Sequence, residues 1–236
     1  MEKQKFDGYA DKYDSWFVAN EPVFLSEFKL VKESIESVKH DNTLSIGCGS
    51  GLFELALKNN GIEIQDCIEP SSDMAEIAKK RGFNVKVTTV EDANLEENFY
   101  DLIYFNGSSS YIVDLEEPYK KCYKALKENG HLIIIDVPKE SAYGLMYLLA
   151  KNVGEYEHID LAGVMPKLPY PMELVKSANW HTIEYKKKAL AKSEFSEDFS
   201  FKQTLCNNPL YTDKIVEDVR DGYREGGYVA IIATKK

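Results

Sequence analysis

The chain has 236 residues, 44% of them hydrophobic, and a formal net charge of −10. This length suits one well-buried α/β domain with additional segments. The acidic balance disfavours a nucleic-acid substrate, because the phosphate backbone would be repelled. No apolar run approaches the roughly 20 residues of a membrane span, and residues 1–5 do not form a signal peptide. We therefore expect a cytoplasmic protein that acts on a small molecule, without nucleic-acid or membrane partners.

Cysteines and basic clusters are assigned to ordinary structural positions. The chain contains four widely separated cysteines: Cys48, Cys67, Cys122 and Cys206. They form no C-x-x-C pair, so we predict buried thiols, no disulfide framework and no metal site. The basic run 79–81 falls at the end of a predicted helix, where it suits the helix dipole. The run Lys186–Lys188 falls in a predicted strand, and we expect both runs to be solvated.

Residues 6–39 are predicted to be helical and to lead into the first strand. The second helix, from Glu21 to Lys39, has apolar residues on its inner face: Phe24, Phe28, Val31 and Ile35. The first helix has aromatic residues at helical spacing: Tyr9, Tyr13, Trp16 and Phe17. Two interpretations stay open, since this aromatic face either packs against the domain or closes over a ligand. In the second case Tyr13 or Trp16 would attract a cation.

A glycine-rich turn follows a short apolar run at Thr43–Gly51, which reads T-L-S-I-G-C-G-S-G. Leu44 and Ile46 indicate a brief strand, and the apolar residues from Leu52 onward indicate a helix. The glycines remove side chains from the turn, so a ligand can approach the main-chain N–H groups. The helix N-terminus favours a negatively charged group there. The segment is thus half of a β-α-β unit with a ligand-binding turn.

An acidic residue ends the second predicted strand, Glu63–Ile68, and lies 18 residues beyond Gly51. At the carboxyl edge of a parallel sheet, Glu69 can accept hydrogen bonds from both hydroxyls of a ribose. The ligand is therefore expected to be a nucleoside. A dinucleotide fingerprint requires G-x-G-x-x-G, but Leu52 and Glu54 occupy the two alternative third positions. This spacing argues against a nicotinamide dinucleotide.

Four landmarks resemble motifs of the class I S-adenosylmethionine-dependent methyltransferases. The first is the G-x-G-x-G turn, and the second is Glu69–Met74, which is similar to the acid-x-S-x-x-M segment of that family. The third, F-Y-D-L-I at 99–103, resembles its fourth strand, and the fourth, L-K-E-N-G-H-L at 126–132, resembles its "LKPGGxL" turn into strand five. Together they cover residues 39–137. One difference is Ser45, which stands where many members have an acid that reaches the methionine amino group.

The resemblance implies S-adenosyl-L-methionine as the cofactor, together with a set of residues that would bind it. These residues are Tyr13, Gly47, Cys48, Gly49, Gly51, Glu69, Pro70, Met74, Thr89, Val90, Glu91, Asn106 and Gly107. In the family, adenine is held by an acid twelve residues before the acid that opens strand four, but here that position is Thr89. Either Thr89 and the N–H of Val90 hold the ring with Glu91 nearby, or a shortened loop lets Asp92 do so. Spacing favours the first alternative.

The polar loop 106–111 follows strand four and lies at the same edge of the sheet. The resemblance implies that Asn106 and Gly107 flank the methionine part, with Ser108 or Tyr111 beside the acceptor. A serine run is otherwise a flexible connection. The pattern F-x-x-Y-A-x-x-Y-D at Phe6–Asp14 resembles the N-terminal lid of many small-molecule methyltransferases, which favours the lid interpretation of the first helix.

The predicted fold is α/β, with a doubly wound, mostly parallel sheet of seven strands. Later elements are a strand at Leu132–Val137, a helix at Met172–Ser177, strand six at Trp180–Leu190 and strand seven at Tyr228–Thr234. The resemblance implies the order 3-2-1-4-5-7-6, with strand seven antiparallel. We expect one domain, made of an N-terminal helical lid (1–40), a cofactor-binding core (41–137) and substrate-lid insertions (138–171 and 191–227).

The leading hypothesis for function is methyl transfer to a small-molecule acceptor by in-line displacement. The protein would mainly align donor and acceptor and exclude water, because the sulfonium already activates the methyl carbon. No catalytic residue is identified, and the candidates for a base are Tyr13, Tyr111 and His158. Two other interpretations are a non-catalytic nucleoside-binding protein of this fold and a nicotinamide-dependent oxidoreductase.

Overall fold

The computed structural model describes residues 5–236. The first four residues belong to the segment 1–5 that we do not expect to be a signal peptide, and they lie outside the described residues. The helices are α1 (Ala10–Ala19), α2 (Glu21–Glu36), α3 (Leu52–Asn59), α4 (Ser72–Lys80), α5 (Glu116–Ala125), α6 (Ala142–Val153), α7 (Met172–Ser177) and α8 (Ile183–Lys192). The strands are β1 (Thr43–Ile46), β2 (Asp66–Ile68), β3 (Asn84–Lys86), β4 (Tyr100–Asn106), β5 (Leu126–Asp136), β6 (Ser200–Thr204), β7 (Arg220–Asp221) and β8 (Tyr228–Thr234). Short 3-10 turns occupy Ser109–Tyr111, Ile159–Leu161 and Pro209–Tyr211.

The strands form one sheet of eight, in the order β3-β2-β1-β4-β5-β8-β6-β7. Strands β1 to β5 pair in parallel, and β8 pairs antiparallel with both β5 and β6. The predicted fold class is therefore confirmed, with the predicted strand seven corresponding to β8. The two-residue strand β7 extends the predicted order at the β6 edge.

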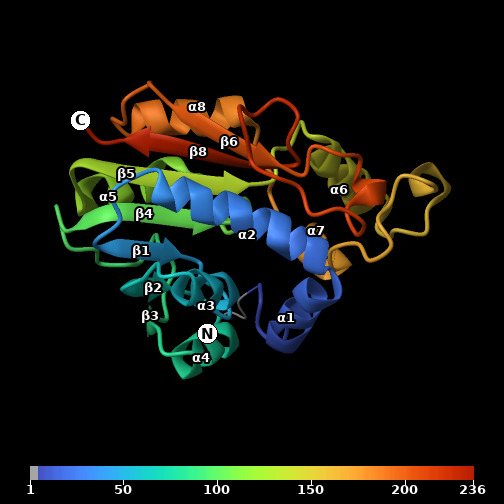
Figure 1. Ribbon diagram of the computed structural model, residues 1–236, viewed down its shortest axis with the longest axis horizontal. Helices are drawn as coiled ribbons and strands as arrows, with labels where there is room; N and C mark the ends of the chain where they lie inside the picture. The colour runs from blue at the N-terminus through green and yellow to red at the C-terminus, as the bar shows by residue number, and fades with distance from the viewer. Residues whose placement is uncertain (1–4) are drawn as a thin grey trace.

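Helices cover both faces of the sheet, and alternate strand residues face each layer. In β4, Leu102 and Tyr104 belong to the core that contains residues of α2 and α3, whereas Ile103 and Phe105 belong to the core that contains residues of α5 and α8. Strands buried on both faces have the continuous apolar runs seen here, because neither side meets water. Figure 1 shows α2 crossing one face, with α8 at the β8 end of the sheet.

The prediction of strand six at Trp180–Leu190 is wrong. This segment is mostly helix α8, which begins after Thr182, whose hydroxyl oxygen accepts a hydrogen bond from the N–H of Tyr185 at 3.1 Å. The strand that pairs with β8 is β6, at Ser200–Thr204. The side-chain cap of Thr182 satisfies a free N–H of the first turn, which stabilises a helix start despite the strand-like composition.

The expected solvation of Lys186–Lys188 is wrong for the first residue. Lys186 lies on the inner face of α8, is only 1% exposed, and places its Nζ 3.4 Å from Oδ2 of Asp136, which is 2% exposed. Each buried charge therefore has an opposite charge beside it, as a desolvated ion requires. Lys188 is exposed, as expected.

The remaining expectations concern membrane-spanning helices, metal sites and cysteines. None of the helices within residues 5–236 has the length and hydropathy needed to cross a bilayer. In the same part of the chain, no cluster of three or more His, Cys, Asp or Glu is arranged to hold a metal ion. The four cysteines are free, and all but Cys206 are buried.

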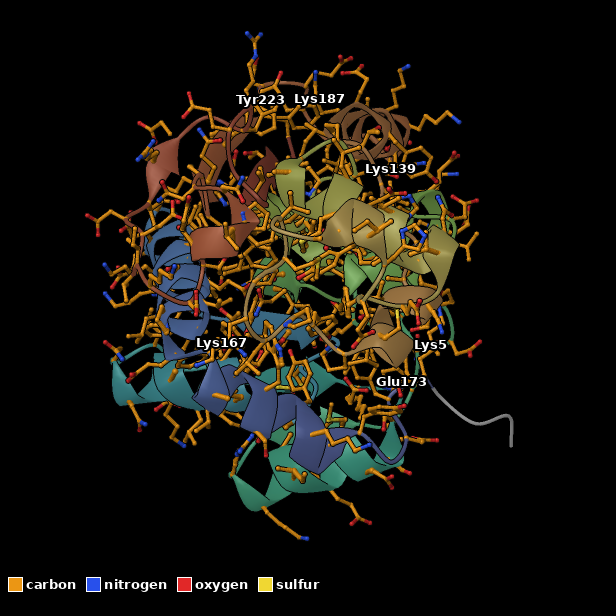
Figure 2. All side chains as sticks on the ribbon, turned by 90° about the vertical axis from the view of Figure 1, so that its right-hand side faces the viewer. Lys5, Lys139, Lys167, Glu173, Lys187 and Tyr223 are labelled. Carbon is orange, nitrogen blue, oxygen red and sulfur yellow. The ribbon has the colours of Figure 1, made fainter. Side chains whose placement is uncertain are left out.

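Strands β1, β4 and β5 point their carboxyl ends toward one side of the molecule. Helices α1, α6 and α7 and the long connection between α6 and α7 lie on that side (Figure 1). Figure 2 looks onto this edge and shows Lys167 and Glu173, of the α6–α7 connection and α7, on the face that covers the strand ends. In an open α/β sheet, ligands bind outside the carboxyl ends of the strands, so this edge is the place to look for a site.

Candidate functional site

A cavity of about 240 Å³ lies at the carboxyl edge of the sheet. The turns after β1, β2, β3, β4 and β5 supply one wall, and residues from α1, α2, α6 and the α6–α7 connection supply the other. Most of the lining is apolar or aromatic, with a few acidic and main-chain polar groups. This combination is typical of a small-molecule site, where polar groups fix orientation and apolar walls exclude water.

The turn after β1 leaves no room for side chains. Gly47 has φ +73°, and an ideal Cβ at this position would overlap the Cβ of Ser108 and lie 3.0 Å from its hydroxyl oxygen. The N–H of Gly47 donates to the carbonyl oxygen of Ile68 at 2.7 Å, which ties the turn to the end of β2. Gly47 and Gly49 both line the cavity, so main chain is exposed to a ligand there.

Glu69 connects the glycine turn to the start of α4. Its Oε2 accepts a hydrogen bond from the N–H of Gly49, and its Oε1 accepts one from the N–H of Ser71, both at 2.8 Å. The side chain is 4% exposed and lines the cavity. Burial raises the pKa of Glu69 to about 7, against the opposing effect of the two N–H donors. The carboxylate is thus fixed in position, with capacity to accept further hydrogen bonds from a ligand.

Ser45 takes part in a buried polar cluster rather than in the cavity wall. Its hydroxyl donates to Oε1 of Glu54 at 2.7 Å, and the hydroxyl of Tyr104 donates to the same oxygen at 2.8 Å. Burial raises the pKa of Glu54, which is 1% exposed. The acid that the family resemblance leads one to expect at position 45 is therefore absent, and a carboxylate from α3 lies behind the serine instead.

Three polar contacts attach the α1 region to the glycine turn and to α4. Asp14 forms an ion pair with Arg81 at 2.5 Å, and its other oxygen accepts a hydrogen bond from the hydroxyl of Ser50 at 2.5 Å. Just before α1, the N–H of Gly8 donates to Oδ2 of Asp73 at 2.8 Å. Helix α1 is thereby attached to both the turn and α4, which places its aromatic face above the cavity.

The ends of β4, β5 and β8 form the side of the cavity opposite Glu69. Asn106 accepts a hydrogen bond through Oδ1 from the hydroxyl of Tyr228 at 2.8 Å. The buried carboxylate of Asp136 accepts hydrogen bonds from the hydroxyls of Ser109 and Ser110, at 2.5 and 2.6 Å, in addition to its ion pair with Lys186. The serine run of loop 106–111 is therefore fixed rather than a flexible connection.

Comparison with known proteins decides which family this site belongs to. Residues 44–134 match the family model described as "Methyltransferase domain". Over 98% of both chains, the protein is 29% identical to an S-adenosylmethionine-dependent methyltransferase of Thermotoga maritima, described as a possible histamine N-methyltransferase, with a TM-score of 0.81. The chain contains a methyltransferase domain, and its fold is that of the class I S-adenosylmethionine-dependent methyltransferases.

Other similar proteins carry different names. The methyltransferase is 28% identical to an uncharacterized protein of Methanocaldococcus jannaschii, over 98% of both chains. It is 24% identical to a malonyl-[acyl-carrier protein] O-methyltransferase of Calditerrivibrio nitroreducens, over 77% of this chain and 71% of that protein.

The cofactor of the methyltransferase is S-adenosyl-L-methionine. The glycine turn and the fixed carboxylate of Glu69 fit this group, because they leave room free of side chains and offer a ribose acceptor at one edge. The main-chain N–H groups of Gly47, Cys48 and Gly49 already donate to Ile68 and Glu69, so the expectation that they are free for a ligand is wrong.

The cavity brings together most of the residues predicted to bind the cofactor. The wall contains Tyr13, Gly47, Gly49, Glu69, Pro70, Met74, Thr89, Val90, Glu91, Asn106 and Gly107. Cys48 and Gly51 do not line it, and a Cβ on Gly51 would lie 3.0 Å from the ring of Phe83, so this glycine serves close packing. Asp92 is also outside the wall, where its Oδ2 accepts a hydrogen bond from the hydroxyl of Thr89 at 3.1 Å.

Of the three candidates for a base, the structure places two at the cavity. Tyr13 and Tyr111 line it, and burial raises the pKa of both phenols. His158 lies instead in the α6–α7 connection, outside the cavity wall, with its Nδ1 3.4 Å from Oδ2 of Asp160. Its side chain is 37% exposed and is held by a local turn rather than directed at the strand ends.

Several wall residues were missed by the sequence analysis. They include Glu27, Asp136, Tyr147, Tyr170, Trp180 and Tyr228. Asp136 ends a parallel strand, so the rule that identified Glu69 would also have identified it. For Glu27 and Trp180 no local pattern exists, because their position depends on how α2 and the connection after α7 pack over the sheet.

Proposed function

We propose that this methyltransferase transfers the methyl group of S-adenosyl-L-methionine to a small-molecule acceptor held in the same cavity as the cofactor. The observation that supports this proposal is that one cavity contains both the glycine turn with Glu69 and a second, largely aromatic half below α1 and α6. The known relatives differ in their named acceptors, a carrier-protein-bound malonyl group in one case and possibly histamine in another. The covered shape of this cavity favours a free small molecule over a macromolecule.

The proposed roles of the cofactor-site residues follow their places in the wall. Glu69 accepts hydrogen bonds from the ribose hydroxyls, and the turn containing Gly47 and Gly49 gives the amino-acid part access to main chain. Thr89, Val90 and Glu91 border the adenine, with Met74 packed beside it. Asn106 and Gly107 flank the methionine part, and Tyr13 covers the sulfonium, whose charge its ring attracts.

For in-line displacement, the main tasks of the protein are to align the methyl donor with the acceptor and to exclude water, rather than to supply groups that form bonds. The bound cofactor supplies a methyl group already activated by its positively charged sulfur. Residues 5–40, the described part of the predicted lid 1–40, act as the lid in this proposal. Residues 41–137 hold the cofactor, and 138–171 and 191–227 complete the acceptor side. The last range contributes β6 and β7 to the sheet as well as loops. The whole chain is proposed to act as one domain.

Isothermal titration calorimetry with S-adenosyl-L-methionine tests the cofactor site. Glu69→Ala should weaken binding by about 100-fold or more, because two charge-assisted hydrogen bonds of 1.5–3 kcal/mol each are lost. Glu76→Gln, an exposed position on α4, is the matched control and should bind like the wild type. Equal affinity of Glu69→Ala and wild type would remove Glu69 from the site. Methylation of carrier-protein-bound substrates alone, with no free small molecule accepted, would refute the acceptor class.

A further inference from the structure

The acceptor half of the cavity is built from aromatic rings that already contact one another. Trp16 and Tyr170 have ring centroids 5.1 Å apart in an edge-to-face arrangement, and Tyr147 stacks on Trp180 at 5.2 Å. The indole N–H of Trp16 also donates to the carbonyl oxygen of Pro169 at 3.0 Å, which fixes that ring on the α6–α7 connection. Because the rings hold one another, this half of the cavity is shaped before a ligand binds.

One carboxylate reaches this aromatic half without a partner of its own. Glu27 projects from α2 into the cavity wall, and among residues 5–236 its carboxylate has no hydrogen bond or ion pair. The two buried acids of the wall are satisfied, since Glu69 accepts from two main-chain N–H groups and Asp136 accepts from two serines and pairs with Lys186. A carboxylate left free in an apolar cavity is costly, and a bound donor would offset that cost.

The charge of Glu27 affects the tyrosines of this half of the cavity. Burial, followed by the charge of Asp136, raises the pKa of Glu27 to about 8. After burial, the charge of Glu27 is among the causes that raise the pKa of Tyr13, Tyr147, Tyr170 and Tyr228. When ionised, Glu27 adds a negative charge to a part of the cavity that is also lined by aromatic rings. Both features favour a ligand that carries a positive charge or donates hydrogen bonds.

We propose that the methyl acceptor is an organic amine and that Glu27 binds its nitrogen. This inference rests on the proposed function. In the reaction, the Glu27 carboxylate takes one proton from the bound ammonium, which frees the nitrogen lone pair. That lone pair forms the new N–C bond as the C–S bond breaks, with the bonding electrons passing to sulfur. The products are S-adenosylhomocysteine, the methylated ammonium and protonated Glu27, which releases its proton to solvent.

The test compares Glu27→Gln with Glu33→Gln, an exposed position on the same helix. Cofactor affinity is measured by calorimetry, and S-adenosylhomocysteine release is measured with 2-phenylethylamine, tryptamine and histamine, and with the alcohols and carboxylic acids of the same skeletons. Wild type should methylate at least one amine and none of the other compounds. Glu27→Gln should keep cofactor affinity within about twofold and lose about 100-fold or more in kcat/KM, the range expected for a lost base. Glu33→Gln should behave like wild type.

The possible failures are distinguishable. A wild type that does not bind S-adenosyl-L-methionine contradicts the proposed function itself. A wild type that binds the cofactor but methylates only alcohols or acids, or none of the panel, overturns the amine proposal alone. Loss of cofactor affinity in Glu27→Gln, with the acceptor KM unchanged, also overturns it, because Glu27 would then hold the methionine amino group.

Discussion

Substitution of Gly47 by alanine tests the claim that the turn after β1 must be free of side chains. At φ +73° an alanine costs about 1–2 kcal/mol, and overlap of its Cβ with the Cβ of Ser108 adds about 1–3 kcal/mol. We therefore expect Gly47→Ala to lower the free energy of unfolding by about 2–5 kcal/mol, measured by urea denaturation. It should also weaken cofactor binding, because the methyl group displaces the turn that lines the cavity.

Gly61→Ala is the matched control for this prediction. Gly61 has φ +83°, but no atom lies within 4 Å of its ideal Cβ, so only the backbone cost of about 1–2 kcal/mol applies. The double substitution Gly47→Ala with Ser108→Gly should recover the overlap part, since it removes the Cβ that is struck. Equal losses for Gly47→Ala and Gly61→Ala, or no recovery in the double variant, would refute the steric argument.

Three further predictions concern charged groups. Because the proposed contact with both ribose hydroxyls needs ionised Glu69, whose pKa is about 7, cofactor affinity should fall about tenfold per pH unit below 7 in wild type and stay flat in Glu69→Gln, as followed by calorimetry. Lys186→Met should lower the free energy of unfolding by about 3–5 kcal/mol, because it leaves the Asp136 charge buried alone, whereas exposed Lys188→Met should change it by less than about 0.5 kcal/mol. The folded-state pKa of Glu27, about 8 against an ordinary 4.5, means that its ionisation opposes folding and that stability is lost as pH rises from 4.5 to 8. Glu27→Gln should therefore raise Tm at pH 8 by several degrees and little at pH 4.5, and a uniform shift would contradict this.

The elements around the glycine turn were predictable because their signals are local. Glycines, a capping serine and short apolar runs fix β1, α3 and the start of α4, where Ser71 caps the helix as expected. The acid at the end of β2 was found from the same kind of reasoning, since a parallel strand brings its last side chain to the ligand edge. Such arguments need only a few consecutive residues.

The segment after Trp180 shows where local reasoning fails. Its aromatic and β-branched residues favour a strand, but Ile183, Lys186 and Leu190 are buried at helical spacing on α8. The middle residue of that stripe is a lysine, whose burial depends on Asp136 from a distant strand. From the sequence alone a charged residue is expected to be solvated, so the helical spacing of the buried residues of α8 could not be recognised. The real β6 is short, and four of its five residues are polar, which gave it no strand signal.

Most of the proposed acceptor half of the site could not be predicted, because it is assembled from distant segments. Glu27, Tyr147, Tyr170 and Trp180 come from four separate parts of the chain and meet only in the folded cavity. Each has an ordinary local environment, as an aromatic or polar position on a helix or loop. They come together only because their elements pack over the sheet, and no short stretch of sequence contains information about that packing.

The position of β8 has a consequence for biosynthesis. Residues 228–234 lie between β5 and β6, so they fill the interior of the sheet rather than its edge. A ribosome that has made only the first 220 residues has produced β5 and β6 without the strand that joins them. In the nascent protein, β5 and β6 therefore each keep an unpaired edge until residues 228–234 are made, and such an edge is a template for pairing with other chains.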